Sequence, residues 1–491
     1  MQLEARSPAT GERLGAVEAT TAAGVREAAE RAAAAQPLWA SVPAAARARY
    51  VRRAARLMLD ELGDLALMLA RETGRPRTEA ALGELLPAIS GLSDLVEDGP
   101  AALADRRLGR PALLRGGRRA RGVQQPRGVI GILGAPSSPW TEPALEVAAA
   151  LLAGNGVLLA PAAPLAAERL RRTLVRAGIP EELVAVVHGA EARAALDDEC
   201  ARVVSLAGPE AKGAMLVLEN APVETVASAA LWAAFAAGGR HPAAAGRLVC
   251  VPSVAEPLLG LLRERAARLQ VGDPSSEDAE IGPLRSAEDL AEVDALVGEA
   301  VAGGAELLCG GATRVEGLSG AFYAPAVLRR VPADARILRE AVPGPVLAVV
   351  EAPGEAAAIA LVQAGPVGAR PTDRRLRGGV VSIWAGDSAK GERVARTLQT
   401  ELTWVNEHGA VAPGPALRLQ RHVAPRQVAS RPALIGGAPR LPYDPALVRA
   451  RTATTRLVHG RESDRLTVLR RDAAPLFRAA LRVGSGLVRR R

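Results

Sequence analysis

The sequence predicts an α/β protein that contains two units built around parallel sheets. Between Val129 and Leu218, short apolar segments alternate with helical segments, a pattern typical of a parallel sheet with crossover helices. Residues 240–405 repeat this alternation with Gly-Pro punctuation and predict a second α/β unit. Residues 20–110, ahead of both units, are rich in alanine and show helical periodicity.

The predicted elements follow from spacing and from helix-stop residues. Apolar residues recur at three- and four-residue intervals in Ala22–Ala35 and in Ala44–Thr73, which predicts helices there. Gly74 and Pro76 end the second of these segments. Residues 364–379 are rich in Arg, Gly and Pro and predict a loop. Beyond residue 441, the tail predicts two basic amphipathic helices, at about 446–459 and 463–483.

Composition excludes several classes of protein. The 491-residue chain is long enough for two or three domains, and its apolar runs are shorter than the roughly 20 residues that a transmembrane helix needs. The net charge of +9 is carried almost wholly by arginine and is spread along the chain, without the aromatic-interleaved motifs of nucleic-acid binders. The polar N-terminus does not resemble a secretory signal, so we expect a cytoplasmic protein.

The three cysteines, Cys200, Cys250 and Cys309, have neither the number nor the spacing of a disulfide framework or a metal site. We therefore predict no metal, and we expect each thiol to behave as a small buried hydrophobe. A role for Cys250 as a displaced nucleophile is the weaker interpretation, because this residue should lie in the strand after the candidate site. His241 is notable only as the neighbour of Pro242.

The segment Phe235–Arg247, which reads FAAGGRHPAAAGR, resembles the nucleophile segment of the aldehyde dehydrogenase superfamily, F-x-N-x-G-Q-x-C-x-A-x-x-R. Phe235, Gly239, Ala244 and Arg247 stand at the spacing of that motif. In this register Pro242 falls on the catalytic cysteine.

Further motifs of the family occur in the family's order. These are SPATGE at 7–12, QPRGVIGIL at 125–133, VAAALLAGNGVLLAP at 147–161, VVSLAGPEAKG at 203–213, LVLENAP at 216–222 and WVN at 404–406. The LVLENAP segment is closest in style to members that resemble succinate-semialdehyde dehydrogenase.

The resemblance implies a domain organisation. A Rossmann-type cofactor domain would take residues 1–114 and 128–218, and a catalytic-type α/β domain residues 219–405. A β-arm for oligomerisation would use residues 115–127 and 406–430, followed by a basic helical extension at 441–491.

The positions that carry the family's chemistry are replaced. Proline has no side-chain heteroatom and no main-chain N–H, so Pro242 supplies neither the nucleophile nor an oxyanion donor. The oxyanion asparagine falls on Ser137, whose hydroxyl is shorter. The general base falls on Leu216, which cannot accept a proton, while nearby Glu219 is expected to be a solvated carboxylate.

The implied cofactor is NAD or NADP, but its contacts are also replaced. The lysine that binds the adenine ribose falls on Ala160, and the acidic residue that selects the cofactor falls on Ala163. Of the phosphate turn, Gly208 and Gly213 remain, but its serine is Pro209. The glutamate and phenylalanine of the E-E-I-F-G-P-V segment become Ala341 and Pro343. The sequence is also too short after Gly213 for the usual crossover helix.

Intact chemistry would imply NAD(P)-dependent oxidation of a small aldehyde, a semialdehyde among the candidates, to a carboxylate. The replacements predict a homologue that is catalytically impaired or inactive. One alternative is an active dehydrogenase that uses an unforeseen residue. The other is a non-catalytic subunit or scaffold that pairs with an intact paralogue. We expect either a homo-oligomer or a hetero-oligomer with such a paralogue. No nucleic-acid partner and no transmembrane segment are expected.

Overall fold

The computed structural model describes residues 1–107, 119–206, 213–241, 243–364, 380–400, 402–409, 414–430, 452–453 and 456. The chain forms two compact units. Met1–Ala102 and Pro126–His422 make up the first unit, and Leu103–Gln125 and Val423–Arg491 make up the second. No helix among the described residues combines the length and the apolar character that crossing a membrane requires.

The first unit begins with a hairpin and a run of helices. Strands β1 (Gln2–Arg6) and β2 (Arg13–Glu18) pair antiparallel, and the SPATGE turn between them is closed by a hydrogen bond of 2.9 Å from Ser7 N to Glu12 O. The helices that follow are α1 (Ala22–Ser41), α2 (Ala44–Asp60), α3 (Leu62–Thr73), α4 (Arg77–Glu79), the π-helix η1 (Ala80–Leu85) and α5 (Leu86–Ala102). The predicted helix stop at Gly74 is confirmed, because this residue caps α3 with a left-handed φ of 76°.

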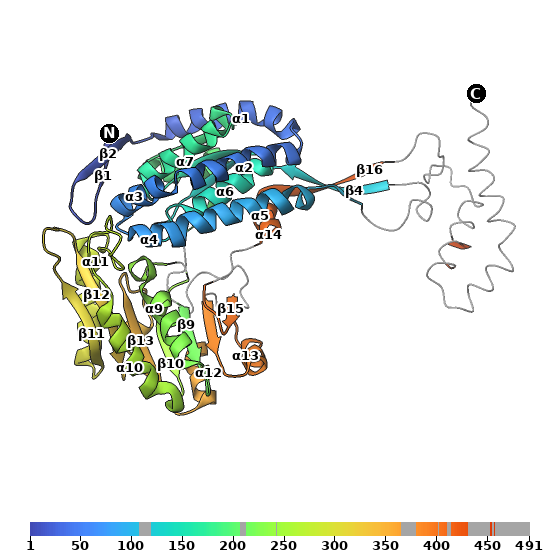
Figure 1. The fold of residues 1–491 in the computed structure, drawn as a ribbon. Coiled ribbons are helices and arrows are strands. Elements are labelled where there is room, and N and C mark those ends of the chain that lie inside the picture. Colours follow the sequence, from blue (N-terminus) through green and yellow to red (C-terminus); the bar gives the residue numbers. More distant parts are fainter. Residues whose placement is uncertain are drawn as a thin grey trace, which may run out of the picture. The chain divides into compact units, whose positions relative to one another are not determined.

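A four-stranded parallel sheet forms the core of the Rossmann-like part (Figure 1). Its order is β7-β6-β5-β8, so the strand order reverses at β5. The strands are β5 (Val129–Leu133), β6 (Gly156–Ala160), β7 (Val184–Val186) and β8 (Arg202–Ser205); a 3-10 turn, η3 (Glu181–Leu183), precedes β7. The connecting helices are α6 (Thr141–Leu152), α7 (Pro164–Arg176) and α8 (Ala190–Glu199). Helix α6 is buried along almost its whole length, since α2 and α5 pack against it.

A seven-stranded mixed sheet forms the other part of this unit, in the order β11-β12-β13-β10-β9-β14-β15. Only the β11–β12 pair is antiparallel. The strands are β9 (Gly213–Val217), β10 (Ala245–Cys250), β11 (Glu306–Thr313), β12 (Phe322–Arg329), β13 (Val346–Glu351), β14 (Val380–Trp384) and β15 (Leu402–Val405). The helices are α9 (Val223–Gly239), α10 (Pro252–Arg268), α11 (Ala287–Ala302), α12 (Glu355–Ala364) and α13 (Ser388–Ala395), and a 3-10 turn, η4 (Arg336–Leu338), precedes β13.

The position of β9 corrects the predicted domain boundary. We placed residues 213–218 in the cofactor domain, but β9 hydrogen-bonds to β10 and β14 in the seven-stranded sheet. Only residues 206–212 separate β8 from β9. Because a crossover back to a parallel neighbour needs a dozen or more residues, the chain cannot add a fifth strand beside β8 and enters the other sheet instead.

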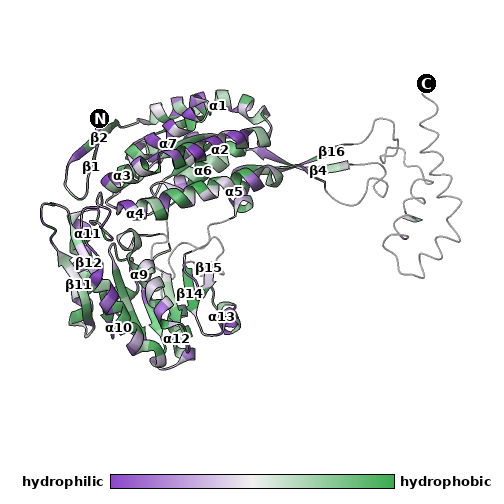
Figure 2. Ribbon diagram, in the orientation of Figure 1, coloured by the Kyte–Doolittle hydropathy of each residue, from purple (hydrophilic) through white to green (hydrophobic). Residues whose placement is uncertain are grey.

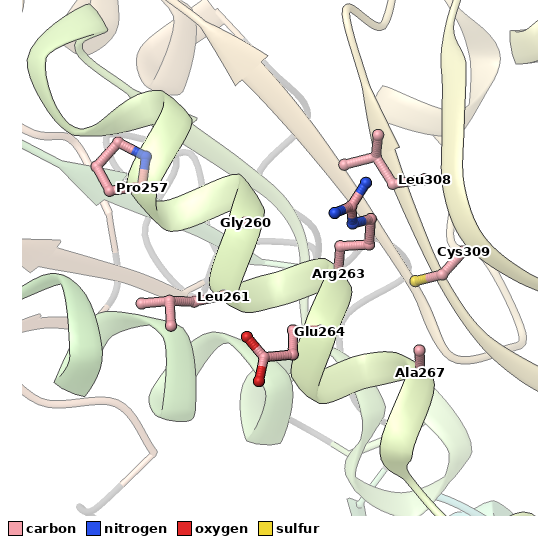
Figure 3. A pocket seen from close by; sticks show the side chains of 8 residues that line it. All are labelled: Pro257, Gly260, Leu261, Arg263, Glu264, Ala267, Leu308 and Cys309. Atoms are coloured by element: carbon pink, nitrogen blue, oxygen red, sulfur yellow. The ribbon is translucent and has the colours of Figure 1, made fainter.

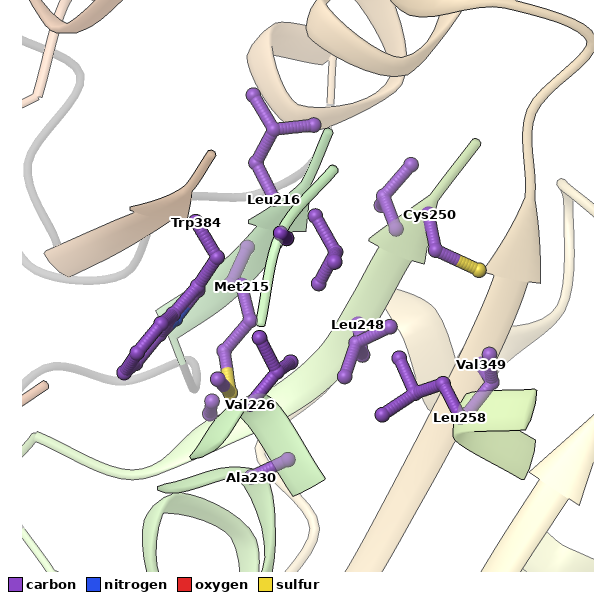
Figure 4. Packing of buried hydrophobic residues seen from close by; sticks show 14 of the residues in the cluster. Met215, Leu216, Val226, Ala230, Leu248, Cys250, Leu258, Val349 and Trp384 are labelled. Carbon is purple, nitrogen blue, oxygen red and sulfur yellow. The ribbon is translucent and has the colours of Figure 1, made fainter. Parts of the chain in front are cut away.

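The apolar core of the seven-stranded sheet is continuous and well packed. Its central strands are hydrophobic along their length, as Figure 2 shows. Met215 of β9 packs with Leu248 of β10 and with Val226 and Ala230 of α9, whereas Leu216 points to the opposite face of the sheet (Figure 4). Strand β9 is buried at every position, as expected for a strand covered on both faces.

The second unit contains a three-stranded sheet in the order β16-β4-β3. Its strands are β3 (Arg106–Arg107), β4 (Arg119–Pro126) and β16 (Val423–Ser430). Helix α14 (Pro415–Gln420), which precedes β16, belongs to the first unit. Of the predicted basic extension at 441–491, only residues 452–453 and 456 are described, so both of its predicted helices lie largely outside the described residues. The predicted loop at 364–379 lies outside them as well, apart from Ala364.

Candidate functional site

The segment that resembles the family's nucleophile loop follows a sharp kink at the end of α9. Ala237 and Gly238 both adopt left-handed backbone angles, with φ of 56° and 60°. At Gly239 φ is 75°, and a Cβ atom there would lie 2.0 Å from the carbonyl oxygen of Gly344. Only glycine fits this position without displacing the backbone. The kink therefore directs the chain to Arg240 and His241; Pro242 itself lies outside the described residues.

A half-buried carboxylate, Glu79, holds the kink in place. Its Oε1 atom accepts a hydrogen bond of 2.5 Å from the main-chain N–H of Ala237. Burial raises the pKa of Glu79, and the negative charge of Glu84 adds to this effect, while Arg75 and Arg240 oppose it. The sequence pattern does not single out Glu79, because a glutamate in a helical stretch is usually solvated.

Arg75 and Glu84 form a buried ion pair beside the same segment. The Nη1 of Arg75 lies 2.7 Å from Oε1 of Glu84, and their side chains are only 3% and 2% exposed. The other oxygen of Glu84 accepts the main-chain N–H groups of Trp140 and Thr141, which caps the N-terminus of α6. Such a pair is expensive to break, because without Glu84 the buried Arg75 would keep only the more distant carboxylate of Glu79, at 3.9 Å.

This ion pair also fixes the turn that carries Ser137. The Nη2 of Arg75 donates a 2.6 Å hydrogen bond to the carbonyl oxygen of Ser137. The loop that would carry the oxyanion asparagine is therefore anchored, although a half-buried serine stands in that asparagine's place.

Two histidines, His241 and His408, contact the main chain of Ala243. The main-chain N–H of Ala243 donates to Nδ1 of His241 at 3.1 Å. His408 Nε2 lies 2.8 Å from the carbonyl oxygen of Ala243, and its Nδ1 lies 3.0 Å from the hydroxyl of Ser382. Since a carbonyl can only accept, His408 carries its proton on Nε2 and accepts from Ser382 through Nδ1.

Burial, with smaller contributions from nearby Arg75 and His408, lowers the pKa of His241 to about 3. Burial also lowers the pKa of His408. The indole rings of Trp232 and Trp404 enclose the pair, with ring centroids 4.9 Å from His241 and 5.0 Å from His408, respectively. At neutral pH the site thus presents uncharged imidazoles rather than a proton-transfer group near pH 7.

We predict that His241 makes the fold acid-sensitive. Its pKa is lower in the folded state than the ordinary value of about 6.5, so the unfolded chain binds the extra proton first and stability declines as pH falls from about 6.5 towards 3. His241→Asn keeps a hydrogen-bond acceptor but does not titrate. Urea unfolding at several pH values should show that the free energy of unfolding falls less with decreasing pH for the variant than for the wild type. Parallel curves for the two proteins would contradict the prediction.

Leu216, at the family's general-base position, lies inside the hydrophobic core. Its side chain is 0% exposed in β9 and packs among apolar neighbours rather than at a site (Figure 4). Glu219 is exposed, in line with a solvated carboxylate.

No thiol of the chain is activated. Cys250 is fully buried in β10, where burial raises the pKa of its thiol to about 12 (Figure 4). Burial likewise raises the pKa of Cys200 to about 12. Thiols with such pKa values stay protonated at neutral pH and are poor nucleophiles.

Cys309 lies in β11, at the edge of the seven-stranded sheet and separated from β10 by β12 and β13. It lines an open groove of about 650 Å³ between α10 and β11, together with Leu308, Arg263 and Glu264 (Figure 3). Burial raises the pKa of this thiol too. The expectation of a buried hydrophobe is confirmed for Cys250, whereas Cys200 and Cys309 are half-buried. Within the described part of the chain, no group of His, Cys, Asp and Glu could hold a metal ion.

The carboxyl edge of the four-stranded sheet, where a dinucleotide would bind, lacks the expected contacts. Ala160 ends β6 and is fully buried, and Ala163 caps α7 without any polar side-chain atom. Ala341 is exposed and Pro343 is half-buried in the segment before β13. Neither methyl groups nor a proline ring can bind ribose hydroxyls, so these residues do not fit the cofactor's polar contacts.

The phosphate-turn residues contribute little more. Gly208 and Pro209 lie outside the described residues. Gly213 begins β9, and a Cβ atom there would lie 2.5 Å from the carbonyl oxygen of Val380 in β14. Close packing between two strands is enough to explain this glycine, so its role in phosphate binding stays a prediction.

Comparison with known proteins identifies the family. The model of the aldehyde dehydrogenase family matches residues 1–213 and 203–416. The chain belongs to this family, which confirms the resemblance inferred from its motifs.

Among the relatives is a betaine aldehyde dehydrogenase of Cereibacter sphaeroides. It is 29% identical over 428 residues, which cover 82% of this chain and 85% of the relative.

Solved structures confirm the α/β aldehyde dehydrogenase fold. A putative methylmalonate-semialdehyde dehydrogenase from Sinorhizobium meliloti, complexed with NAD, superimposes with a TM-score of 0.79 at 23% identity, covering 88% of this chain and 94% of that one. The glyceraldehyde-3-phosphate dehydrogenase GapN of Methanocaldococcus jannaschii, complexed with NADP, gives 0.76 at 18% identity, covering 88% and 99%.

Proposed function

We propose that this member of the aldehyde dehydrogenase family has lost the family's reaction, the NAD(P)-dependent oxidation of an aldehyde. The observation that carries the proposal concerns sulfur. Pro242 stands at the nucleophile position, and burial raises the pKa of each of the three thiols in the chain. Without a thiolate there is no thiohemiacetal, and replacing a nucleophile can cost on the order of 10⁶ in rate.

The local geometry also argues against a substitute nucleophile. His241 is the nearest side chain with a heteroatom along the sequence, but its Nδ1 accepts the N–H of Ala243. Leu216 leaves the deacylation step without a base, because it is packed into the core. An active enzyme with an unforeseen residue is therefore the weaker hypothesis.

Assays with purified full-length protein test the proposal. The protein is incubated with NAD or NADP and a panel of aldehydes, including semialdehydes and betaine aldehyde, and reduced cofactor is followed by absorbance. The Cereibacter sphaeroides relative serves as the positive control. We expect no reduced cofactor above background from this chain, and turnover that scales with its concentration would overturn the proposal.

A structural role is the second candidate. The segments that resemble the family's arm, β4 and β16, are neighbours in one sheet although the catalytic positions are replaced. This supports a subunit that assembles with copies of itself or with an intact paralogue in the cytoplasm. Co-expression with such a paralogue, followed by light scattering on the purified complex, tests this role. A mixed oligomer would support the scaffold, and separate elution of the two chains would argue against it.

A further inference from the structure

Arg193 binds the ends of two neighbouring strands at the candidate cofactor edge. It projects from α8, and its Nη1 donates to the carbonyl oxygens of Ala160 at 3.1 Å and Pro161 at 3.4 Å. Its Nη2 donates to the carbonyl oxygen of Gly134 at 3.2 Å. Gly134 directly follows β5, and Pro161 directly follows β6. One guanidinium thus joins the carboxyl ends of both strands.

These strand ends are the place where an open α/β sheet binds a nucleotide. Ligands of such sheets lie in the crevice outside the carboxyl ends of the strands, near the point where the strand order reverses. In this sheet the order reverses at β5, one of the two strands that Arg193 joins. A planar guanidinium with several fixed donors can satisfy several carbonyl groups at once, so the contact is well matched.

The main chain at the ends of β5 and β6, which Arg193 contacts, is closely packed. Gly134 N donates to Ala160 O at 2.8 Å, so the pairing of β5 and β6 continues one residue beyond β5. A Cβ atom added at Gly134 would lie only 3.1 Å from Pro161 Cα and 3.2 Å from Ala162 N. These contacts hold the ends of β5 and β6 close together beside the Arg193 guanidinium.

Two of the helix starts at this edge, those of α6 and α7, already bind a carboxylate of the chain itself, whereas the start of α8, which carries Arg193, has no side-chain cap. Oriented N–H groups at helix N-termini usually hold a pyrophosphate. Glu84 already occupies those of α6, and Glu72 accepts the N–H groups of Leu165 and Ala166 in α7, both at 2.8 Å. After β8, only residues 206–212 precede β9, which leaves no length for a crossover helix.

We propose that Arg193 is a built-in plug of the dinucleotide crevice, which keeps NAD and NADP out of this chain. The inference goes beyond the lost catalytic positions. The site has lost the family's contacts to the cofactor, and the Arg193 side chain also fills it. One substitution at Arg193 therefore reopens it.

Isothermal titration of the full chain with NAD and NADP tests the plug. We expect no saturable binding by the wild type up to about 1 mM, and at least about ten-fold tighter binding by Arg193→Ala. Arg172→Ala, which removes an exposed arginine from α7, is the matched control and should behave as the wild type. Saturable sub-millimolar binding by the wild type would overturn the plug, as would an Arg193→Ala variant that binds no better.

Two further readouts keep the test informative. Arg193→Gln retains polar contacts and is expected to fold if Arg193→Ala does not; it should bind better than the wild type, and equal binding would count against the plug. Hydrogen exchange of residues 134–136 and 160–163 should be slowed by NAD in the variants only. Wild type that binds NAD without oxidising an aldehyde would refute the plug and leave the proposed loss of chemistry intact, so the two proposals can fail separately.

Discussion

Replacing Glu84 by alanine is expected to destabilise the protein by about 3–5 kcal/mol, the usual result of removing one partner of a buried ion pair. The variant leaves Arg75 charged and buried, because the two side chains are only 3% and 2% exposed. It also removes the acceptor for the N–H groups of Trp140 and Thr141 at the start of α6. The midpoint of urea unfolding, followed by tryptophan fluorescence, measures the loss.

An exposed pair provides the control for this variant. Glu340 lies 2.9 Å from Arg336, and both side chains are about half exposed, at 46% and 56%. Since exposed pairs contribute roughly 0–1 kcal/mol, Glu340→Ala should shift the midpoint little. Equal shifts for Glu84→Ala and Glu340→Ala would show that Arg75 finds water or another partner, contrary to the packing described above.

The second large effect is expected from Leu216→Glu, the substitution that restores the family's general base. A carboxyl group at this position would enter the apolar core. The free energy of unfolding of the protein should then fall by roughly 4 kcal/mol or more at neutral pH. The pKa of this carboxyl group would be raised in the folded state, so the fold binds the proton more tightly than the unfolded chain does. Stability should therefore be better preserved at about pH 5 than at about pH 8.

Leu216→Gln is the matched control, since it introduces a polar group of the same shape that does not titrate. We expect it to be destabilised to a similar extent at both pH values. A glutamate variant as stable as the wild type at about pH 8 would show that the side chain reaches solvent. That result would place residue 216 at an open site and weaken the proposed loss of the base.

These expectations change what a rescue experiment can show. Pro242→Cys combined with Leu216→Glu would restore both family residues in sequence, but the glutamate would lie in the core and Arg193 would still join β5 and β6. Recovery of activity is therefore expected to need at least the reopening of the crevice as well. Loss of the reaction is, on this view, distributed over several parts of the fold.

Local patterns predicted much of the architecture. The helix stop at Gly74 and the strand–helix alternation after Val129 depend on short-range preferences that a sequence displays directly. The sheet to which β9 belongs was not predictable in the same way. A strand buried on both faces has the same composition in either sheet, and its partners β10 and β14 come much later in the chain.

The polar part of the site was harder to foresee for a different reason. Arg75, Glu84 and Arg193 are ordinary charged residues of helical or turn segments, and sequence preference predicts that such residues are solvated. Only the tertiary structure shows Arg75 and Glu84 buried together, and Arg193 turned towards three carbonyl groups. His408 is likewise brought to Ala243 from a segment 165 residues further along the chain.

Strand β8 is the last strand of its sheet among the described residues, because the chain leaves for the other sheet after Ser205. A new edge of this kind exposes unpaired backbone groups that can recruit strands from other molecules. Strand β8 is only four residues long and begins with an exposed arginine, Arg202. Short length and charged side chains are the features by which natural edge strands resist aggregation. A family fold shortened at this point therefore has an edge that resists aggregation in concentrated solution.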